Sequence, residues 1–523
     1  MTGSCMQHPW GHAEERPDDC ALIMADTGTA RSYGQMMRNA NRLSHWLIGL
    51  GLQEGASIAL LMENCCSYFE ICWAAKNAGL YYVCIPRQAS VADARYMLEN
   101  SGAKVLFASA ALAKTAQAVC AEMSTAPSLL LVTGDTAEAA NYGAEIALLP
   151  GERPPARRRG ASLLYSSGTT GRPKGIKVAL GDEAPEIPPL RHTMLVATYG
   201  YGPDVRLVVP GPFYHTSPLR FSMHVHRAGG CVIGFEKFDA EATLRAMARW
   251  RATHALLVPT MMIRMLKLPE AVRGAFDLSA LRYAIHQAAP CPVAVKEAMF
   301  AWWGPIIHEM YGGTEGIGQT VIGPEEWLRH RGSVGRAPPG VELHIVGPDG
   351  AALGPHADGL IYMYNGRRFE YLDDRDKTAQ AHHPKGWATL GDIGHVDEDG
   401  YLYLTDRQSN LIITGGVNVY PQEAENLLIG HPEVADAAVF GVPHGEFGEE
   451  VKAVVVPQSE LGTAEQAALA TRLIAYCRQQ LNPVKCPRSV EFAAALPRSE
   501  VGKIMKRELQ RLYGRASLVP GTE

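Results

Sequence analysis

Short apolar runs alternate with helical patterns through roughly the first 310 residues of the chain. Leu43, Trp46, Leu47 and Leu50 have the i, i+3, i+4, i+7 spacing of one face of a helix. The next apolar run, Ile58 to Met62, is short and continuous, as in a strand buried on both faces. Such alternation is typical of α/β layering around largely parallel sheets.

The same pattern predicts further elements along the first 310 residues. We expect a helix near Tyr68 to Asn77 and strands at Val105 to Ala108, Leu129 to Thr133, Arg206 to Val209, Leu256 to Pro259 and Pro305 to His308. Ligands of parallel sheets bind beyond the carboxyl ends of the strands, so the loops that leave these strands are where chemistry is expected.

The pattern changes near residue 335 to short strands and turns rich in glycine. Gly347-Pro348-Asp349-Gly350 and Asp397-Glu398-Asp399-Gly400 are two such turns, and they indicate a β-rich subdomain. After Asp406 the helix and strand pattern begins again. It predicts a helix led by Pro421, strands at Ala437 to Val442 and Val451 to Val456, and a helix with Thr463 and Gln466 as its capping box.

The predicted fold is therefore α/β with two domains. The large N-terminal domain, residues 1–406, would hold two α/β layered subdomains and the β-rich subdomain. Residues 407–523 would form a small, mobile C-terminal α/β domain. A chain of 523 residues is long enough for such an arrangement.

Composition and charge exclude several classes of protein. The chain is 47% apolar and 20% charged, with a net charge of −5, so we expect no nucleic-acid partner. Its 11 cysteines include no C-x-x-C pair, which favours reduced thiols in a cytoplasmic enzyme. The first thirty residues carry acidic side chains instead of an export signal, and no run of 18 apolar residues indicates a membrane span.

Candidate chemistry begins directly after the apolar pair Leu163-Leu164. Glycines let backbone N–H groups approach closely and a lysine adds positive charge, so the segment that follows can wrap a polyphosphate. It is not a Walker A loop, because Pro173 breaks the required spacing. The phosphate-binding candidates are Ser166, Ser167, Gly168, Thr169, Thr170, Gly171 and Lys174.

Further motifs follow in a fixed order. They are Tyr311-Gly312-Gly313-Thr314-Glu315, Gly391-Asp392, Asp406-Arg407, Thr414-Gly415-Gly416-Val417-Asn418-Val419-Tyr420-Pro421 and Pro497-Arg498-Ser499-Glu500-Val501-Gly502-Lys503-Ile504. Together with the glycine-rich loop, this series resembles the adenylate-forming superfamily of acyl-CoA synthetases, firefly luciferase and the adenylation domains of peptide synthetases. The chain looks most similar to bacterial fatty-acid, bile-acid and aryl-acid CoA ligases.

The resemblance implies a reaction in which a carboxylate attacks the α-phosphate of ATP. Two anions meet in that step, so it calls for Mg²⁺ and positive charge at the reacting centre. In the family pattern Lys503 would be the catalytic lysine, Glu315 the Mg²⁺ ligand and Thr314 a contact of the α-phosphate.

Other positions match the family's binding residues. The resemblance implies that Tyr311 and Gly312 line the adenine site, with the tyrosine stacked on the base, and that Asp392 and Arg407 hold the ribose. The remaining implied roles are His215 beside the acyl carboxylate, Ala288 and Ala289 in the adenine and acyl pocket, Gly415 and Gly416 at the entry of the thiol, and Ser409 as the hinge.

The chain departs from the family pattern in three places. Gln287 occupies a position where most members have glycine, so it should narrow or re-route part of the acyl pocket. Ser409 stands where aspartate or lysine is common. The ribose motif Thr389-Leu390-Gly391-Asp392 has an inserted leucine, which leaves the aspartate in place.

These features predict an ATP-dependent acyl-CoA ligase that uses ATP, Mg²⁺ and coenzyme A. Apolar residues near the pocket motifs favour a hydrophobic acid, namely Leu219, Phe221, Met223, Met261, Met262, Tyr283 and Ile317. One alternative is a ligase that loads a carrier protein, and another is a nucleotide-binding protein without catalysis. His215, His224 and His226 lack the companions of a zinc site. By family analogy the enzyme would be a monomer or a homodimer.

Overall fold

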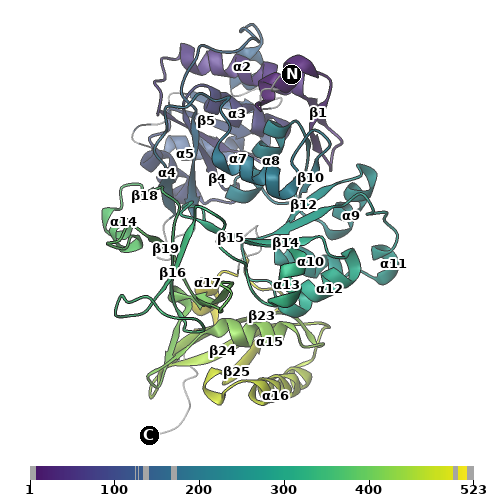
Figure 1. Cartoon of the computed structure of the whole chain (residues 1–523), viewed down its shortest axis with the longest axis vertical. Coiled ribbons are helices and arrows are strands. Elements are labelled where there is room, and N and C mark those ends of the chain that lie inside the picture. Colours follow the sequence, from purple (N-terminus) through teal and green to yellow (C-terminus); the bar gives the residue numbers. More distant parts are fainter. Residues whose placement is uncertain are drawn as a thin grey trace.

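The computed structural model describes residues 7–123, 125, 127, 129–133, 140–166, 173–498 and 504–514. Two sheets with their helices form the upper and middle parts of the molecule in Figure 1, and the C-terminal part of the chain lies below them. This arrangement agrees with the α/β fold, the large N-terminal domain and the small C-terminal domain predicted from the sequence.

The first sheet has the strand order β18-β9-β8-β4-β3-β5-β6-β7 and is parallel from β8 to β7. Its strands are β3 (Ser57–Leu61), β4 (Tyr81–Ile85), β5 (Val105–Ser109), β6 (Leu129–Thr133), β7 (Ala140–Asn141), β8 (Ala161–Ser166), β9 (Lys174–Lys177) and β18 (Glu370–Tyr371). Its helices are α2 (Tyr33–Gly49), α3 (Cys66–Asn77), α4 (Val91–Ser101), the short η1 (Ala110–Leu112), α5 (Ala113–Ala121) and α6 (Tyr142–Ile146).

The second sheet has the order β15-β14-β13-β12-β10-β11-β1-β2, with antiparallel strands only at its two edges. Its strands are β1 (Cys20–Met24), β2 (Ala30–Ser32), β10 (Arg206–Val209), β11 (Cys231–Gly234), β12 (His254–Leu257), β13 (Tyr283–His286), β14 (Ile307–Gly312) and β15 (Gln319–Ile322). The helices of this part are α1 (Pro9–Glu15), α7 (Leu190–Tyr199), α8 (Thr216–Ala228), α9 (Ala240–Arg249), α10 (Pro259–Leu266), α11 (Glu270–Arg273) and α12 (Val293–Trp303).

Helices between the two sheets join them into one core. A single hydrophobic cluster contains Tyr82 of β4, Trp73 of α3, Phe221 of α8 and Val209 of β10, all of them buried. Burial of a large apolar side chain stabilises a fold by about 1.5–3 kcal/mol, so this shared layer holds the sheets in a fixed relation. The residues between the sheets are therefore positioned by both.

The β-rich subdomain is a four-stranded antiparallel sheet in the order β16-β17-β19-β20. It consists of β16 (Glu342–Val346), β17 (Gly359–Tyr364), β19 (Ala388–Val396) and β20 (Leu402–Arg407), with α13 (Pro324–Arg329) and α14 (Arg375–Ala381) beside it.

The C-terminal part holds a five-stranded sheet in the order β22-β21-β24-β23, with β25 paired to β24. Its elements are η2 (Gln408–Asn410), β21 (Ile412–Thr414), β22 (Val417–Val419), α15 (Pro421–Ile429), β23 (Val434–His444), β24 (Gly448–Pro457), α16 (Thr463–Gln480), η3 (Pro483–Lys485), β25 (Ser489–Phe492) and α17 (Lys506–Tyr513).

Three sequence predictions need correction. The strand expected at Leu256 to Pro259 ends at Leu257, because Pro259 opens α10 in the first turn, where its missing N–H costs nothing. The strand expected at Pro305 to His308 is β14, which begins at Ile307 and runs on to Gly312. The capping box expected at Thr463 and Gln466 is not formed: the N-cap of α16 is Gly462, and the Glu465 carboxylate accepts from its N–H at 2.8 Å.

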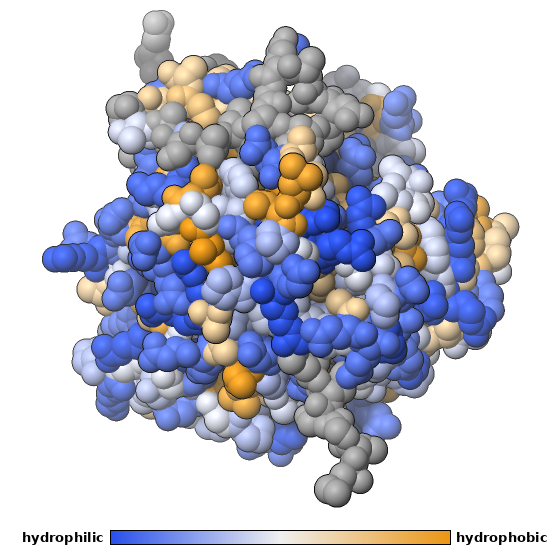
Figure 2. All heavy atoms as spheres, turned by 90° about the horizontal axis from the view of Figure 1, so that it is seen from above, coloured by the Kyte–Doolittle hydropathy of each residue, from blue (hydrophilic) through white to orange (hydrophobic). Residues whose placement is uncertain are grey.

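On the face shown in Figure 2 hydrophilic residues dominate, and hydrophobic residues form small separate patches. None of the helices in the described ranges has the length and apolar character to cross a bilayer. All ten cysteines within those ranges are free.

Candidate active site

The predicted nucleotide residues meet where β14 approaches β19 and β20. The Tyr311 hydroxyl donates to Asp392 Oδ2 at 2.8 Å, and Arg407 Nε donates to Asp392 Oδ1 at 3.0 Å. Asp392 and Arg407 are register partners on adjacent strands, and Asp392 is only 6% exposed. The structure therefore brings three predicted residues together around one carboxylate.

Electrostatics favour the charged guanidinium of Arg407 and the neutral phenol of Tyr311. The Asp392 carboxylate raises the pKa of Arg407, so the guanidinium stays charged. Burial, and then Asp392, raise the pKa of Tyr311 well above its usual value, so the phenol remains a hydrogen-bond donor. An ionised carboxylate has about four acceptor positions, which leaves room on Asp392 for the hydroxyls of a sugar.

A bulge in β19 presents Asp392 at this point. Between the pairs Leu360↔Ile393 and Tyr362↔Thr389 the chain advances two residues in β17 and four in β19, which leaves two extra residues in β19. Gly391 has a φ of 80°, in the left-handed region that favours glycine. A Cβ placed on Gly313 would lie 2.6 Å from Leu390 Cδ2, so the leucine of the unusual ribose motif packs against the backbone of the Tyr-Gly-Gly-Thr-Glu motif.

Glu315 lies next to this cluster. Residues that the sequence motifs did not identify hold it and its neighbours Thr314 and Gly316. Tyr371 donates its hydroxyl to Glu315 Oε1 at 3.0 Å, and Thr216 and Thr314 share a hydrogen bond of 2.8 Å between their hydroxyls. Asn365 donates to the Gly316 carbonyl at 2.8 Å. Thr216 directly follows His215 in the sequence, which was a usable signal, whereas nothing in the local sequence distinguished Tyr371 or Asn365.

The ends of the glycine-rich loop are fixed by a strand pair. Ser166, the last residue of β8, is the register partner of Lys174, the first residue of β9. Ser167, Gly168, Thr169, Thr170 and Gly171 lie outside the described residues. The Lys174 ammonium sits over the Tyr371 ring at 5.0 Å from its centroid, and burial lowers the pKa of Lys174. Lys174, Tyr371 and Glu315 therefore form one connected group.

The predicted acyl residues are divided between different layers. His215 is the residue preceding α8, and its ring lies 4.3 Å from that of Tyr214. Leu219, Phe221 and Met223 of α8 are buried in the core between the sheets. Met261 and Met262 belong to a second core cluster and Ile317 to a third. His226 Nε2 donates to the Ala21 carbonyl at 3.1 Å, so it is a core histidine.

The loop after β13 is strained. Ala288 has a φ of 79°, a conformation that side chains with a Cβ rarely adopt. Gln287 Nε2 is buried and has no hydrogen-bond partner among the described residues. Behind the loop, buried Lys296 donates to Glu309 Oε2 at 2.7 Å, and burial lowers the pKa of the adjacent His286 well below its usual value. Ala289, the residue after Ala288, is half-buried.

The Asp406 carboxylate links the end of the N-terminal part to the start of the C-terminal part. Asp406 Oδ1 accepts from the Arg407 N–H at 2.6 Å and from Asn410 Nδ2 at 3.0 Å, while Oδ2 accepts from the Gln422 N–H at 2.9 Å in the first turn of α15. The predicted hinge residue Ser409 is exposed in η2, between these contacts.

The remaining predicted residues belong to the C-terminal part. Gly415 and Gly416 form the turn between β21 and β22 with φ values of 57° and 79°, as a tight hairpin turn requires. Lys503 lies outside the described residues. On either side of it, Arg498 and Ile504 form an antiparallel bridge. Arg507 in α17 interacts electrostatically with Lys174.

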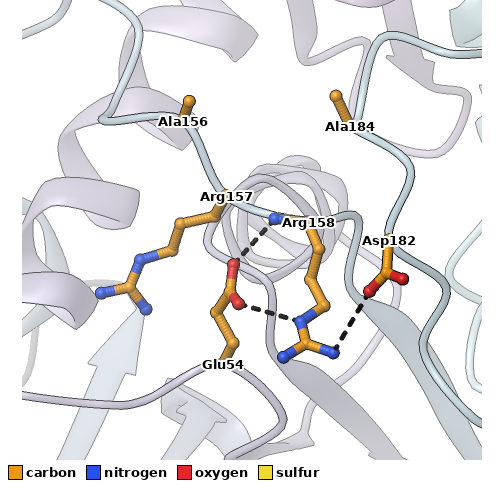
Figure 3. Close-up of a pocket in the computed structure, with 6 residues that line it drawn as sticks. All are labelled: Glu54, Ala156, Arg157, Arg158, Asp182 and Ala184. Carbon is orange, nitrogen blue, oxygen red and sulfur yellow. Dashed lines mark hydrogen bonds and ion pairs between the residues drawn. The ribbon is translucent and has the colours of Figure 1, made fainter.

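A surface hollow elsewhere is unrelated to this cluster. Figure 3 shows Glu54 accepting from the Arg158 N–H at 2.8 Å and from Arg158 Nε at 2.9 Å, with Asp182 on the other side of the guanidinium. The hollow measures about 370 Å³, and none of the predicted site residues lines it. Its charges already neutralise one another.

The fold and the site together define an enzyme that activates acids with ATP. Two family models cover most of the chain: "AMP-binding enzyme" matches residues 10–366, and "AMP-binding enzyme C-terminal domain" matches residues 423–503. The chain belongs to the AMP-binding enzyme family, and within it to the AMP-forming acid–thiol ligases.

Several relatives match over nearly their whole length. A feruloyl-CoA synthase of Amycolatopsis sp is 32% identical over 97% of this chain and 98% of its own. A long-chain-fatty-acid–CoA ligase of Mycobacterium tuberculosis is 29% identical over 94% and 95%. The crystal structure of ATP-bound MatB from Rhodopseudomonas palustris superposes with a TM-score of 0.82 at 28% identity, covering 96% of this chain and 97% of MatB.

Proposed function

We propose that the enzyme converts a carboxylic acid with an apolar body into an acyl-adenylate and then transfers the acyl group to the thiol of coenzyme A. The observation that carries this proposal is the joining of Tyr311, Asp392 and Arg407 around one buried carboxylate, next to the group of Lys174, Tyr371 and Glu315. A polar ribose site beside a cationic phosphate site is what an adenylating enzyme needs.

In this proposal Asp392 accepts hydrogen bonds from the ribose hydroxyls, and Arg407 orients it by donating to Oδ1. Tyr311 and Gly312 line the adenine site together with Ala288 and Ala289. The loop from Ser166 to Lys174 surrounds the phosphates, and Thr314 contacts the α-phosphate with its orientation fixed by the bond to Thr216. These contacts hold the α-phosphate in line with the attacking carboxylate, which is the main source of rate in such a transfer.

Glu315 would hold Mg²⁺. A magnesium ion prefers oxygen ligands and keeps several waters, so one carboxylate plus phosphate oxygens can bind it. Tyr371 occupies Oε1 of Glu315 and no hydrogen bond from a described residue engages Oε2, which fits that role. The ion would supply positive charge to the phosphates, Glu315 would hold it, and Lys174 would contact the phosphates from the loop.

The second half-reaction requires the C-terminal domain, residues 407–523, to turn about Ser409. Lys503 would contact the reacting carboxylate and α-phosphate in the first step, and Gly415 and Gly416 would border the entry of the thiol in the second. Arg507 of α17 is near enough to Lys174 for the two positive charges to repel. Because α17 follows Lys503 closely in the chain, this nearness supports the first arrangement.

The experiment incubates purified protein with ATP, Mg²⁺ and a panel of monocarboxylic and dicarboxylic acids, with and without coenzyme A, and quantifies AMP and acyl-CoA by mass. We expect AMP and acyl-CoA to rise together. In Lys503→Ala adenylation falls by a factor of 100 or more, an order set by the loss of a group that contacts the transition state. Exposed Lys104→Ala is the matched control. Absence of turnover with every acid would overturn the proposal.

Loading of a carrier protein is the second candidate. It is favoured by a fatty acid–[acyl-carrier-protein] ligase of Streptomyces coeruleorubidus that is 31% identical over 96% of this chain. The same assay with a phosphopantetheinylated carrier protein distinguishes the two acceptors. Faster acyl transfer to the carrier protein than to coenzyme A would favour this second function.

We further propose that the enzyme acts in the cytoplasm as a monomer or homodimer. Free cysteines throughout the described ranges support a reducing compartment. Light scattering of the purified protein distinguishes the two oligomeric states.

A further inference from the structure

Cationic side chains gather beside the proposed acyl site without acidic partners. They are Lys76 of α3, Arg191 of α7 and Arg220 of α8, with the imidazole of His224 among them. No ion pair or hydrogen bond to a carboxylate engages any of the four within the described part of the chain. Buried Arg227 shows the contrast. It donates to the carbonyls of Gln7, Glu186 and Pro185 at 2.6–3.1 Å.

The cluster begins at the reacting centre. Thr216, the first residue of α8, is bonded to Thr314 of the Tyr-Gly-Gly-Thr-Glu motif. Arg220 and His224 follow at i+4 and i+8, so they share one face of the helix with Thr216. At a rise of about 1.5 Å per residue they lie roughly 6 and 12 Å further along the axis. Arg220 is also within electrostatic reach of Glu315.

This face of α8 is accessible while the rest of the helix is buried. From Pro218 to Val225 the half-buried residues are Arg220 and His224, and the other six are buried. Lys76 has the same status in α3, where the residues from Tyr68 to Asn77 are otherwise buried. Helices packed in a core present these three polar groups to one accessible strip.

Arg191 reaches the strip from α7. Its Cζ lies 5.8 Å from the centroid of the Phe221 ring, and Nη2 lies 3.7 Å from Sδ of Met310, the residue before Tyr311. Arg191 Nε is buried and has no hydrogen-bond partner within the described part. The His192 ring stacks on the His224 ring at 5.5 Å. Met310 and Phe221 thus place the guanidinium between the sheet and α8.

The cluster carries an electrostatic cost in the free enzyme. Burial and the charge of Arg220 lower the pKa of Arg191 to about 10, and burial with the nearby arginines lowers the pKa of Lys76 to about 7. Charges without partners in low-dielectric surroundings destabilise a fold, and a bound anion removes that cost.

We propose that the acid carries a second anionic group at the end remote from its reacting carboxylate, and that Arg191 and Arg220 bind this group. The inference rests on the proposed function and names its substrate class: a dicarboxylic acid, or an acid ending in a sulfonate or phosphate. The reacting carboxylate lies at Thr314, the apolar middle follows the accessible face of α8, and the second anion lies at the arginines. The spacing along α8 favours about five to ten bonds between the two acidic groups.

The test compares substrates that differ by one charge. Adipate and suberate are assayed against monomethyl adipate and monomethyl suberate, and against hexanoate and octanoate, by release of AMP. We expect the wild-type kcat/KM of a diacid to exceed that of its monoester about 100-fold or more, since a site built for a charged group rejects the analogue that lacks it. Arg191→Gln and Arg220→Gln remove most of that preference and leave the monoester rates within about threefold of wild type.

Arg245→Gln is the matched control, because the Arg245 side chain is 63% exposed and pairs with Glu241 on α9. It keeps the diacid preference. Arg220→Lys retains a charge and restores part of the preference that Arg220→Gln loses, but without the bidentate geometry of a guanidinium.

Thermal unfolding separates a binding role from a structural one. Without substrate, Arg191→Gln and Arg220→Gln unfold at the wild-type temperature or above it, because an unpaired charge has been removed. Suberate raises the unfolding temperature of the wild-type protein more than that of either variant. Lower unfolding temperatures for both variants would indicate structural arginines and overturn the proposal.

Three kinetic outcomes are decisive. Monoacids turned over as well as diacids overturn this inference and leave the ligase function intact. A higher KM for ATP in Arg220→Gln, with both acids affected equally, assigns Arg220 to the phosphates and also overturns it. Turnover of neither monoacids nor diacids overturns the proposed function itself, and the inference with it.

Discussion

The two ends of the candidate site differ in how their charges are balanced. At the nucleotide end, the carboxylate of Asp392 is engaged on both oxygens by Tyr311 and Arg407. At the acyl end, Arg191 and Arg220 have no carboxylate among the described residues. Groups that are paired before binding are already oriented for a ligand that is the same in every turnover. Unpaired cations leave the counter-charge to the ligand. Under our proposal they give the acyl end a preference for an acid with a second anionic group.

The largest expected effect comes from breaking the paired end. Asp392→Ala leaves the half-exposed Arg407 guanidinium without its carboxylate and removes the acceptor proposed for both ribose hydroxyls. A hydrogen bond to a charged group contributes about 1.5–3 kcal/mol. We expect kcat/KM for ATP to fall by two to three orders of magnitude, measured by release of AMP. Asp399→Ala, at a side chain that is 73% exposed, is the control. A fall of less than tenfold for Asp392→Ala would mean that the pairing is only structural.

A smaller effect on activity is expected from Tyr371, which contacts the proposed Mg²⁺ ligand Glu315. Tyr371→Phe removes the hydroxyl that donates to Glu315, and the loss of such a supporting hydrogen bond weakens metal binding or activity about 10–100-fold. Titration of activity with Mg²⁺ should give a higher half-saturating concentration in the variant. Tyr476→Phe, on α16, is the matched change of the same chemistry. Equal Mg²⁺ titrations for Tyr371→Phe and wild type would contradict the role given to Tyr371.

The Lys76 side chain, which has no acidic partner among the described residues, should make the stability of the protein depend on pH. The pKa of Lys76 is lowered to about 7, chiefly by burial, so between pH 7 and 10 the unfolded chain binds more protons and wild-type stability rises with pH. Lys76→Met removes this dependence. We expect its stability advantage over wild type, measured by urea unfolding, to be largest at or below pH 7 and to shrink toward pH 10. Lys104→Met, at an exposed lysine, should leave the wild-type pH dependence unchanged.

The smallest effect is expected in the loop between the two ends. Ala288 holds a φ of 79°, which costs an alanine about 1–2 kcal/mol, while glycine costs about 0.4–1 kcal/mol through the entropy of the unfolded chain. Ala288→Gly should therefore stabilise the protein by about 1 kcal/mol or less. Ala289→Gly, next to it, should destabilise. A loss of stability in Ala288→Gly would show that the methyl group makes compensating contacts.

Much of the fold was predictable because the apolar periodicity is strong. The strands at Leu129 to Thr133 and Arg206 to Val209 were predicted with the bounds they have in β6 and β10. Errors occurred where local chemistry decides the end of an element, as at Pro259 and at the start of α16. Periodicity carries no information on where a proline opens a helix, or on which backbone N–H a carboxylate accepts from.

The site was predictable only as far as its motifs reach. The motifs identified Tyr311, Asp392 and Arg407, which the structure brings together. They could not identify Tyr371, which is far from Glu315 in sequence and meets it only through the pairing of β18 with β9. The cationic strip was missed for a similar reason, because Lys76, Arg191 and Arg220 lie on three helices and only packing brings them together.

The contact between Leu390 and Gly313 restricts how this sequence can evolve. A Cβ at position 313 would lie 2.6 Å from Leu390 Cδ2 and 2.7 Å from Glu315 Oε2, so a residue larger than glycine there requires both side chains to give way. In relatives with a compact residue at the position of Leu390, only the glutamate restricts position 313. In an alignment of close homologues the two positions should covary, and a lineage that gained the leucine should have lost every alternative to glycine at 313.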